Sequence, residues 1–173
     1  AARYNPPMSG TLNGPVVQCT DEDPSAVSSD VLCVPVFADG DTEFLRRLDR
    51  ATGGNVGRGR ESGEFNGELH GRFWTDVSDA AWLTRRVLLI GAGDREYFDS
   101  DRARSIAATA GMSARSHAAR RVVLVCPSPT EGTGAHQALA EGLVANRAAR
   151  QAHAAAVLGC SLPFGWSADG GAV

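Results

Sequence analysis

Residues 30–40 read DVLCVPVFADG, and residues 86–93 read RVLLIGAG. In both stretches the apolar residues are nearly continuous rather than alternating, which is typical of strands that are buried on both faces of a sheet. A third run of this kind, RVVLVC, covers Arg121–Cys126. These three runs predict a buried, largely parallel sheet, and Pro35 inside the first run indicates an edge position or a bulge there.

Helical patterns separate the predicted strands. Thr42–Ala51 and Ser100–Ala119 place apolar residues three to four positions apart, with Thr42 or Asp41 and Asp99 or Ser100 as possible N-caps. Ala135–Ala155 predicts a last helix. Two weaker strands are expected at residues 15–20 and 72–77, and the glycine-rich residues 53–71 are expected to form a loop. Alternating strands and helices predict an α/β layer fold.

Composition limits the classes of function. The chain has 173 residues, 43% of them hydrophobic, and a formal net charge of −3 with no lysine. This charge disfavours a nucleic-acid binder. No apolar run approaches the roughly 20 residues of a membrane span, and no signal-peptide pattern occurs. The four cysteines lack metal-site or redox spacing, which predicts reduced thiols and an intracellular, reducing compartment, either cytoplasmic or organellar, with the mitochondrial matrix included.

The chain is expected to hold one domain with an arm at each end. Residues 1–14 are predicted to form an extended arm, residues 15–155 the domain, and residues 156–173 a tail rich in glycine and proline. The tail carries three large apolar residues that we predict to be interaction anchors: Leu162, Phe164 and Trp166.

Two glycine-rich places are weak candidates for binding a phosphate. Gly91 and Gly93 follow a predicted strand, where backbone N–H groups can bind an anion, although GxGxxG is incomplete and Asp94 and Glu96 follow. Arg58 and Arg60 lie in the second place, the glycine-rich loop of residues 53–63, where a tight connection between elements explains the glycines without a ligand.

Catalytic and metal-binding patterns are not found. The carboxylates of residues 21–23 are contiguous and therefore diverge, the histidines have no HxxxH or HExxH spacing, and no GxSxG motif occurs. The sequence therefore predicts no catalytic residue, no metal ligand and no cofactor.

Several stretches together resemble the N-terminal domain of the leucyl aminopeptidase family of metallopeptidases. They are VPVFADG (34–40), LDRATGG (48–54), FNGELHG (65–71), VLLIGAG (87–93) and ALAEGL (138–143). The resemblance covers about residues 15–150 and implies a macro-like three-layer α/β/α sandwich, which in the family precedes a two-metal peptidase domain and helps to build a hexamer. Sequences similar to DxKGR…DSGG and NTDAEGR carry the family's catalytic residues, and neither occurs here.

Three hypotheses follow. The first is a non-catalytic structural or interaction subunit of a larger complex, with protein partners. The second is an N-terminal fragment of a complete metal-dependent aminopeptidase. The third is a macro-like module that binds ADP-ribose or another nucleotide.

Overall fold

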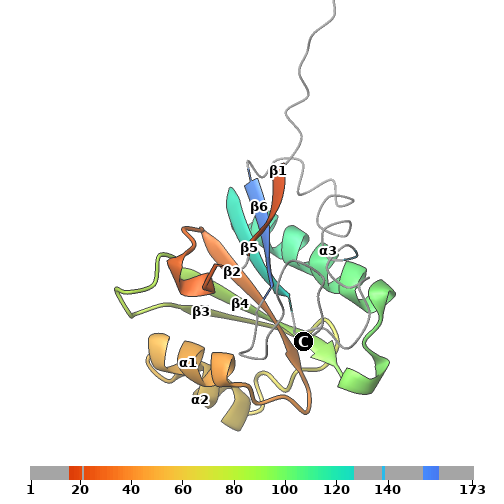
Figure 1. Ribbon diagram of the computed structural model, residues 1–173. Helices are drawn as coiled ribbons and strands as arrows, with labels where there is room; N and C mark the ends of the chain where they lie inside the picture. Colours follow the sequence, from red (N-terminus) through yellow and green to blue (C-terminus); the bar gives the residue numbers. More distant parts are fainter. Residues whose placement is uncertain (1–15, 21, 127–137, 139–153, 160–173) are drawn as a thin grey trace, which may run out of the picture.

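A computed structural model describes residues 16–20, 22–126, 138 and 154–159. Their six strands form one sheet in the order β1-β6-β5-β2-β4-β3 (Figure 1). The strands are β1 Val16–Thr20, β2 Val31–Phe37, β3 Arg72–Asp76, β4 Arg86–Gly93, β5 Arg121–Cys126 and β6 Ala154–Gly159. All neighbouring strands are parallel except β3 and β4, which are antiparallel. The sheet is therefore mixed and largely parallel, as predicted.

Helices cover both faces of this sheet. They are α1 Glu43–Ala51, α2 Asn55–Glu61 and α3 Ser100–Ser116. On one face, the α3 side chain of Ile106 packs in a buried cluster with Leu88 and Ile90 of β4. On the other face, Leu48 of α1 belongs to a second cluster with Leu32 of β2 and other core residues. These two cores confirm the predicted three-layer α/β/α sandwich.

Of the two residues predicted for each N-cap, Thr42 and Asp99 are confirmed. The Thr42 hydroxyl accepts a hydrogen bond from the Leu45 N–H at 3.2 Å, and the Asp99 carboxylate accepts one from the Arg102 N–H at 2.8 Å. Each cap satisfies a backbone donor that the first helical turn leaves unpaired. Helix α3 ends at Ser116, before the predicted Ala119, and Ala118 has the left-handed φ of 54°.

Pro35 lies in the middle of the sheet, so an edge position is wrong. It is paired with Ile90 of β4, and the register between these strands shifts between Val36 and Phe37. Pairing with β5 ends at Cys33. Pro35 therefore lies beyond the hydrogen bonds to β5, where its missing N–H is not needed. The predicted alternative, a bulge, agrees with the register shift next to Pro35.

Three predicted boundaries need correction. Residues 53–71 contain α2, because the carboxylate of Asp49 accepts a hydrogen bond from the Gly57 N–H at 2.7 Å and holds this glycine-rich turn against α1. Gly91 and Gly93, which were predicted to follow a strand, are the end of β4 itself. Strand β6 begins at Ala154, where a helix to Ala155 was predicted, and it crosses the expected boundary between domain and tail. Pairing with β1 and β5 outweighs the helical propensity of these alanines.

Two carboxylates near the start of β2 bind other parts of the fold. The carboxylate of Asp30 accepts hydrogen bonds from the backbone N–H groups of Arg120 and Arg121 at 2.7 and 2.8 Å, and the pKa of Asp30 is lowered chiefly by the Arg121 bond. The pKa of Asp23 is lowered chiefly by Arg47, whose guanidinium bonds both carboxylate oxygens. Both carboxylates thus stabilise the fold in the charged form.

Candidate functional site

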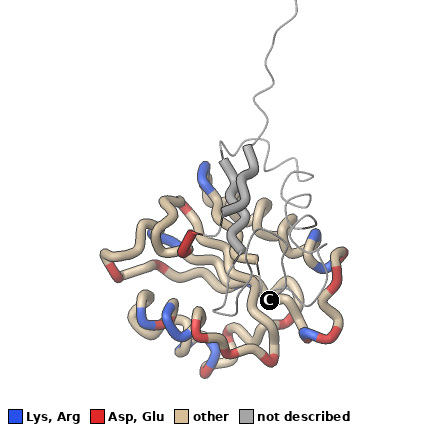
Figure 2. Tube along the Cα trace, in the orientation of Figure 1, with Lys and Arg blue, Asp and Glu red and all other residues tan. Residues whose placement is uncertain are grey.

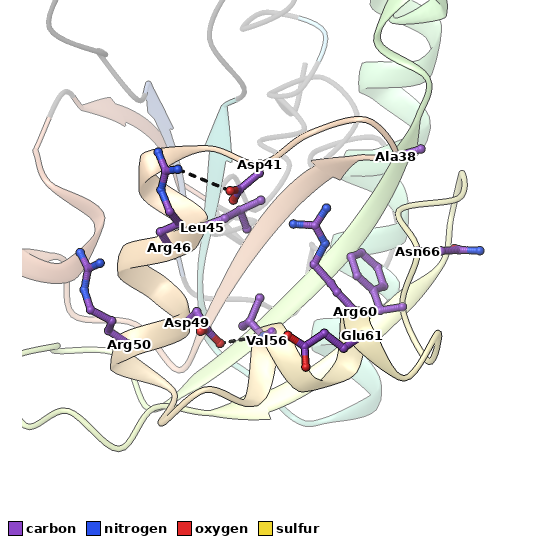
Figure 3. Close-up of a pocket in the computed structure, with 12 residues that line it drawn as sticks. Ala38, Asp41, Leu45, Arg46, Asp49, Arg50, Val56, Arg60, Glu61 and Asn66 are labelled. Atoms are coloured by element: carbon purple, nitrogen blue, oxygen red, sulfur yellow. Dashed lines mark hydrogen bonds and ion pairs between the residues drawn. The ribbon is translucent and has the colours of Figure 1, made fainter.

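A hollow of about 680 Å³ lies between α1, α2 and the segment that follows α2 (Figure 3). Its floor is the outer side of the core, where Leu45, Val56 and Phe65 are buried. Its rim carries three arginines and three carboxylates: Asp41, Arg46, Asp49, Arg50, Arg60 and Glu61. The hollow is thus apolar below and balanced in formal charge above.

Most of the rim charges already have partners within the protein. Arg46 forms ion pairs with Asp41 at 3.5 Å and with Glu43 at 3.2 Å, and Arg50 pairs with Glu43 at 3.6 Å. All of these pairs are exposed, so each is worth at most about 1 kcal/mol. The carboxylate of Asp49 accepts a hydrogen bond from the N–H of Gly57. These contacts account for the charged residues on α1 without a bound ligand.

Arg60 differs from the other arginines of the hollow. Among the described residues it has no recorded hydrogen bond or ion pair, and its side chain is half-buried. Figure 3 shows its guanidinium pointing into the space between α1 and Asn66. Of the two arginines predicted as weak phosphate contacts, Arg60 is therefore the one that faces a cavity.

Arg58, the other predicted arginine, points elsewhere. Its guanidinium donates to the Gly53 carbonyl at 3.0 Å and to the Asn55 side chain at 2.5 Å. These contacts close the turn between α1 and α2. The structure therefore does not bring Arg58 and Arg60 together on one site.

The end of β4 is covered by a segment of the same chain. We call residues 65–71 (FNGELHG) the covering segment. The N–H of Gly91 donates to the Gly71 carbonyl at 2.8 Å, and that of Gly93 donates to the Gly67 carbonyl at 2.9 Å. A Cβ atom on Gly91 would lie 1.7 Å from the Glu68 carbonyl oxygen. The two amides predicted as anion donors are thus already paired, and glycine at position 91 allows a close backbone approach.

His70 fastens the covering segment to α3. Its Nδ1 lies 3.2 Å from the Thr109 hydroxyl, and its Nε2 lies 3.1 Å from the Ser105 hydroxyl. The Thr109 hydroxyl donates to the Ser105 carbonyl at 3.0 Å, so it is placed to accept a hydrogen bond from the Nδ1–H of His70. His70 has a left-handed φ of 66°.

The contact between the Ser105 hydroxyl and His70 resembles a catalytic serine with its histidine base, but nothing else around it does. Ser105 lies inside α3, where the backbone N–H groups are used by the helix itself. An oxyanion needs preorganised donors close to the nucleophile. The arrangement therefore serves to anchor the covering segment, a role that the sequence spacing of 35 residues between His70 and Ser105 did not reveal.

Two cysteines lie in the core as predicted. Cys33 and Cys126 are buried, and burial raises the pKa of the Cys33 thiol to about 12. A thiol with so high a pKa is a poor nucleophile and metal ligand. Within the described part of the chain, no group of three or more His, Cys, Asp or Glu side chains is placed to hold a metal ion.

This fold and its covering segment occur in a known protein family. Residues 33–159 match the N-terminal domain of the cytosol aminopeptidase family. The chain belongs to this family. The match begins inside β2, runs through β6 and includes the covering segment, so the family resemblance found in the sequence is confirmed. A comparison with curated protein sequences finds no match.

Solved structures of similar fold include a leucine aminopeptidase and several macrodomains. A leucine aminopeptidase of tomato has 16% identity and a TM-score of 0.66, with 92% of this chain and 35% of that chain covered. The macrodomain of Mycobacterium tuberculosis DarG has 13% identity and a TM-score of 0.60, with 86% and 100% covered. The Oceanobacillus iheyensis macrodomain with ADP has 10% identity and a TM-score of 0.65, with 89% and 88% covered.

The cytosol aminopeptidase N-terminal domain is therefore macro-like in this chain. The chain spans about a third of the tomato enzyme that it matches. The predicted interaction residues Leu162, Phe164 and Trp166 lie outside the described residues. Among the helices that the structure describes, none has the length and apolarity to span a membrane.

Proposed function

We propose that this cytosol aminopeptidase N-terminal domain works by contact, as a structural or interaction subunit of a larger protein complex. The observation that carries the proposal is the covered end of β4, where the amides of Gly91 and Gly93 bond to the covering segment. In open α/β sheets, ligands bind in crevices outside the carboxyl ends of the strands. Here protein backbone occupies this place beside β4, which supports a scaffold role.

The charge distribution supports protein partners rather than nucleic acid. Figure 2 shows acidic and basic positions interspersed along α1 and α2 instead of one continuous basic stripe. The formal charge of the whole chain is −3. Phosphate backbones are bound by clustered lysine and arginine, and mixed charges are more typical of the rim of a protein–protein interface.

Purification of the tagged full chain from its own cells tests this role. We expect stoichiometric partner proteins in the purified complex, identified by mass spectrometry and placed by cross-linking. A matched chain with Phe164→Ala and Trp166→Ala should lose partners if the predicted tail anchors bind them. A purified 173-residue chain that hydrolyses leucine amide with added Mn²⁺ or Zn²⁺ would overturn the proposal.

A second candidate is that the chain is the N-terminal part of a complete metal-dependent aminopeptidase. The coverage of only 35% of the tomato leucine aminopeptidase favours it. The intact mass of the native protein distinguishes the two. A mass that matches 173 residues supports the subunit, whereas a much larger mass with leucine-amide hydrolysis supports the enzyme.

A third candidate, nucleotide binding, draws on the neighbours solved with ADP. The apolar hollow with Arg60 is the place where this chain could accept a small anion. Calorimetry with ADP-ribose tests it directly. A flat trace would retire this candidate, and heat that is lost in Arg60→Gln would support it over the scaffold.

A further inference from the structure

Strand β3 is the last strand of the sheet, and its outer side has no described strand beside it. The hydrogen bonds on either side of it show which backbone groups face outward. The N–H of Gly91 donates to the Gly71 carbonyl, and the N–H of Val77 donates to the Arg85 carbonyl. In an antiparallel pair, such bonded residues alternate along the strand. Gly71, Phe73, Thr75 and Val77 therefore face β4.

The residues between them face away from β4. The backbone N–H and C=O groups of Arg72, Trp74 and Asp76 point to the open edge of the sheet. The Asp76 carbonyl receives only a long contact of 3.5 Å from the Thr75 hydroxyl. Since an open edge is a template for another strand, natural proteins usually protect it with charges or cover it. Here both ends of the edge are charged, and both are exposed.

The order of the charges makes this edge complementary to itself. We propose that β3 pairs in antiparallel fashion with β3 of a second copy of this chain, about a two-fold axis at Trp74. In this register Trp74 lies opposite Trp74 of the other copy, and Arg72 lies opposite Asp76 at both ends. Every outward-facing residue then meets an outward-facing residue, and both cross-strand charge pairs are attractive.

Side chains next to the edge fit the same register. Arg72, Trp74 and Asp76 share one face of the sheet, the face that carries α3, because Trp74 packs against the α3 core and its ring lies 3.9 Å from the ring of His117. A hollow of about 250 Å³ lined by Trp74, Thr75, Asp76, Arg86 and His117 opens beside the strand. This hollow lies on the β4 side of Trp74, where Arg86 forms an exposed ion pair with Asp76 at 3.6 Å.

The pairing rests on the proposed assembly role and names one partner and one surface for it. A single pair of five-residue strands is small compared with the 1,200–2,000 Å² of a stable interface, so we expect a Kd on the order of 10 µM. Charged ends of a short strand disfavour other registers, since a shift by two residues would remove both charge pairs.

Sedimentation velocity of the full chain tests the pairing from about 1 to about 200 µM, a range that brackets the expected Kd. The wild-type chain should change from monomer to dimer. Arg72→Asp places acids opposite acids at both ends, and Asp76→Arg places bases opposite bases. Each single variant should weaken self-association at least about tenfold, because two attractive contacts become repulsive.

Combining the two charge reversals should restore the dimer. An equimolar mixture of Arg72→Asp and Asp76→Arg should form heterodimers, because each chain then carries one sign at both ends. The double variant Arg72→Asp/Asp76→Arg should dimerise alone. Circular dichroism checks that every variant is folded. If a charge variant does not fold, Asp76→Pro replaces it, since proline removes an outward-facing N–H and blocks the edge.

Two results would overturn the proposal. One is a wild-type chain that stays monomeric over the whole range, and the other is a dimer that neither single charge variant weakens. A monomer that still co-purifies with other proteins would overturn the pairing and leave the assembly role standing. A dimer without any such partners would do the reverse, so the two failures are distinguishable.

Discussion

The end of β4 and the edge formed by β3 belong to neighbouring strands, yet they differ in how their backbone groups are used. At the β4 end, Gly91 and Gly93 give their N–H groups to the covering segment. At the β3 edge, alternation leaves the groups of Arg72, Trp74 and Asp76 facing outward. The backbone N–H groups of Gly91 and Gly93, which the sequence suggested for ligand binding, are therefore bonded within the chain. The backbone groups that remain open belong to β3.

The largest effect is expected from Gly91→Ala. The added Cβ would lie 1.7 Å from the Glu68 carbonyl oxygen and 2.8 Å from the Gly67 carbonyl carbon, so backbone must move. Overpacking of this kind costs about 3 kcal/mol or more of unfolding free energy. Urea denaturation followed by circular dichroism measures the loss.

Gly63→Ala is the matched control for that substitution. Gly63 has a left-handed φ of 76°, and nothing lies within 4 Å of a Cβ built there. Its cost is therefore backbone strain alone, about 1–2 kcal/mol. Equal losses for the two variants would show that the covering segment yields easily, and the β4 end would then not be closed as described.

Proline substitutions on β3 compare its two sides directly. Thr75→Pro removes an N–H that faces Val87 of β4, whereas Asp76→Pro removes one that faces outward. We expect Thr75→Pro to lower the unfolding free energy by about 2 kcal/mol more than Asp76→Pro at a concentration where the chain is monomeric. Similar losses would contradict the assignment of the open edge.

Acid should weaken the fold by protonating Asp23 and Asp30. The folded-state pKa values of Asp23 and Asp30 are lowered, by Arg47 and by the backbone N–H of Arg121 respectively. Their stabilising effect is therefore present above the unfolded pKa of about 3.9 and is lost as the pH falls through the lowered values. Unfolding free energy should drop between about pH 5 and pH 2.

Asp30→Asn gives the control for this pH dependence. We expect a loss of about 1 kcal/mol at pH 7 and a shallower decline toward low pH than in the wild type, because one titrating group has been removed. Unfolding curves measured at pH 7 and at low pH provide both values. A decline as steep as in the wild type would assign the acid sensitivity to other carboxylates.

Much of the fold was readable from the sequence for physical reasons. Continuous apolar runs identified β2, β4 and β5 because strands buried on both faces need them. Thr42 and Asp99 identified two helix starts because their oxygens accept backbone N–H groups locally. Strand β6 was missed because an alanine-rich sequence favours a helix, and only the partners β1 and β5, distant in sequence, favour a strand.

The sites were less readable because they depend on contacts between distant residues. Gly91 has the same surroundings in sequence whether its N–H is free or bonded to Gly71. The hollow at Arg60 is lined by residues of both α1 and α2, which the Asp49 carboxylate joins. The charge order of β3 is visible in RFWTD, but its meaning requires knowing that this strand is an edge.

The smallest effect is expected where the molecule is open. Arg72 is exposed, and no ion pair or hydrogen bond of its side chain is recorded among the described residues. Arg72→Gln should therefore change the unfolding free energy by less than about 0.5 kcal/mol when measured near 1 µM, below the expected Kd for pairing. Gly91→Ala measured under the same conditions provides the contrast. A loss at Arg72 that approaches the loss at Gly91 would mean that the β3 edge already contributes to the stability of the single chain, and the difference between the two regions would disappear.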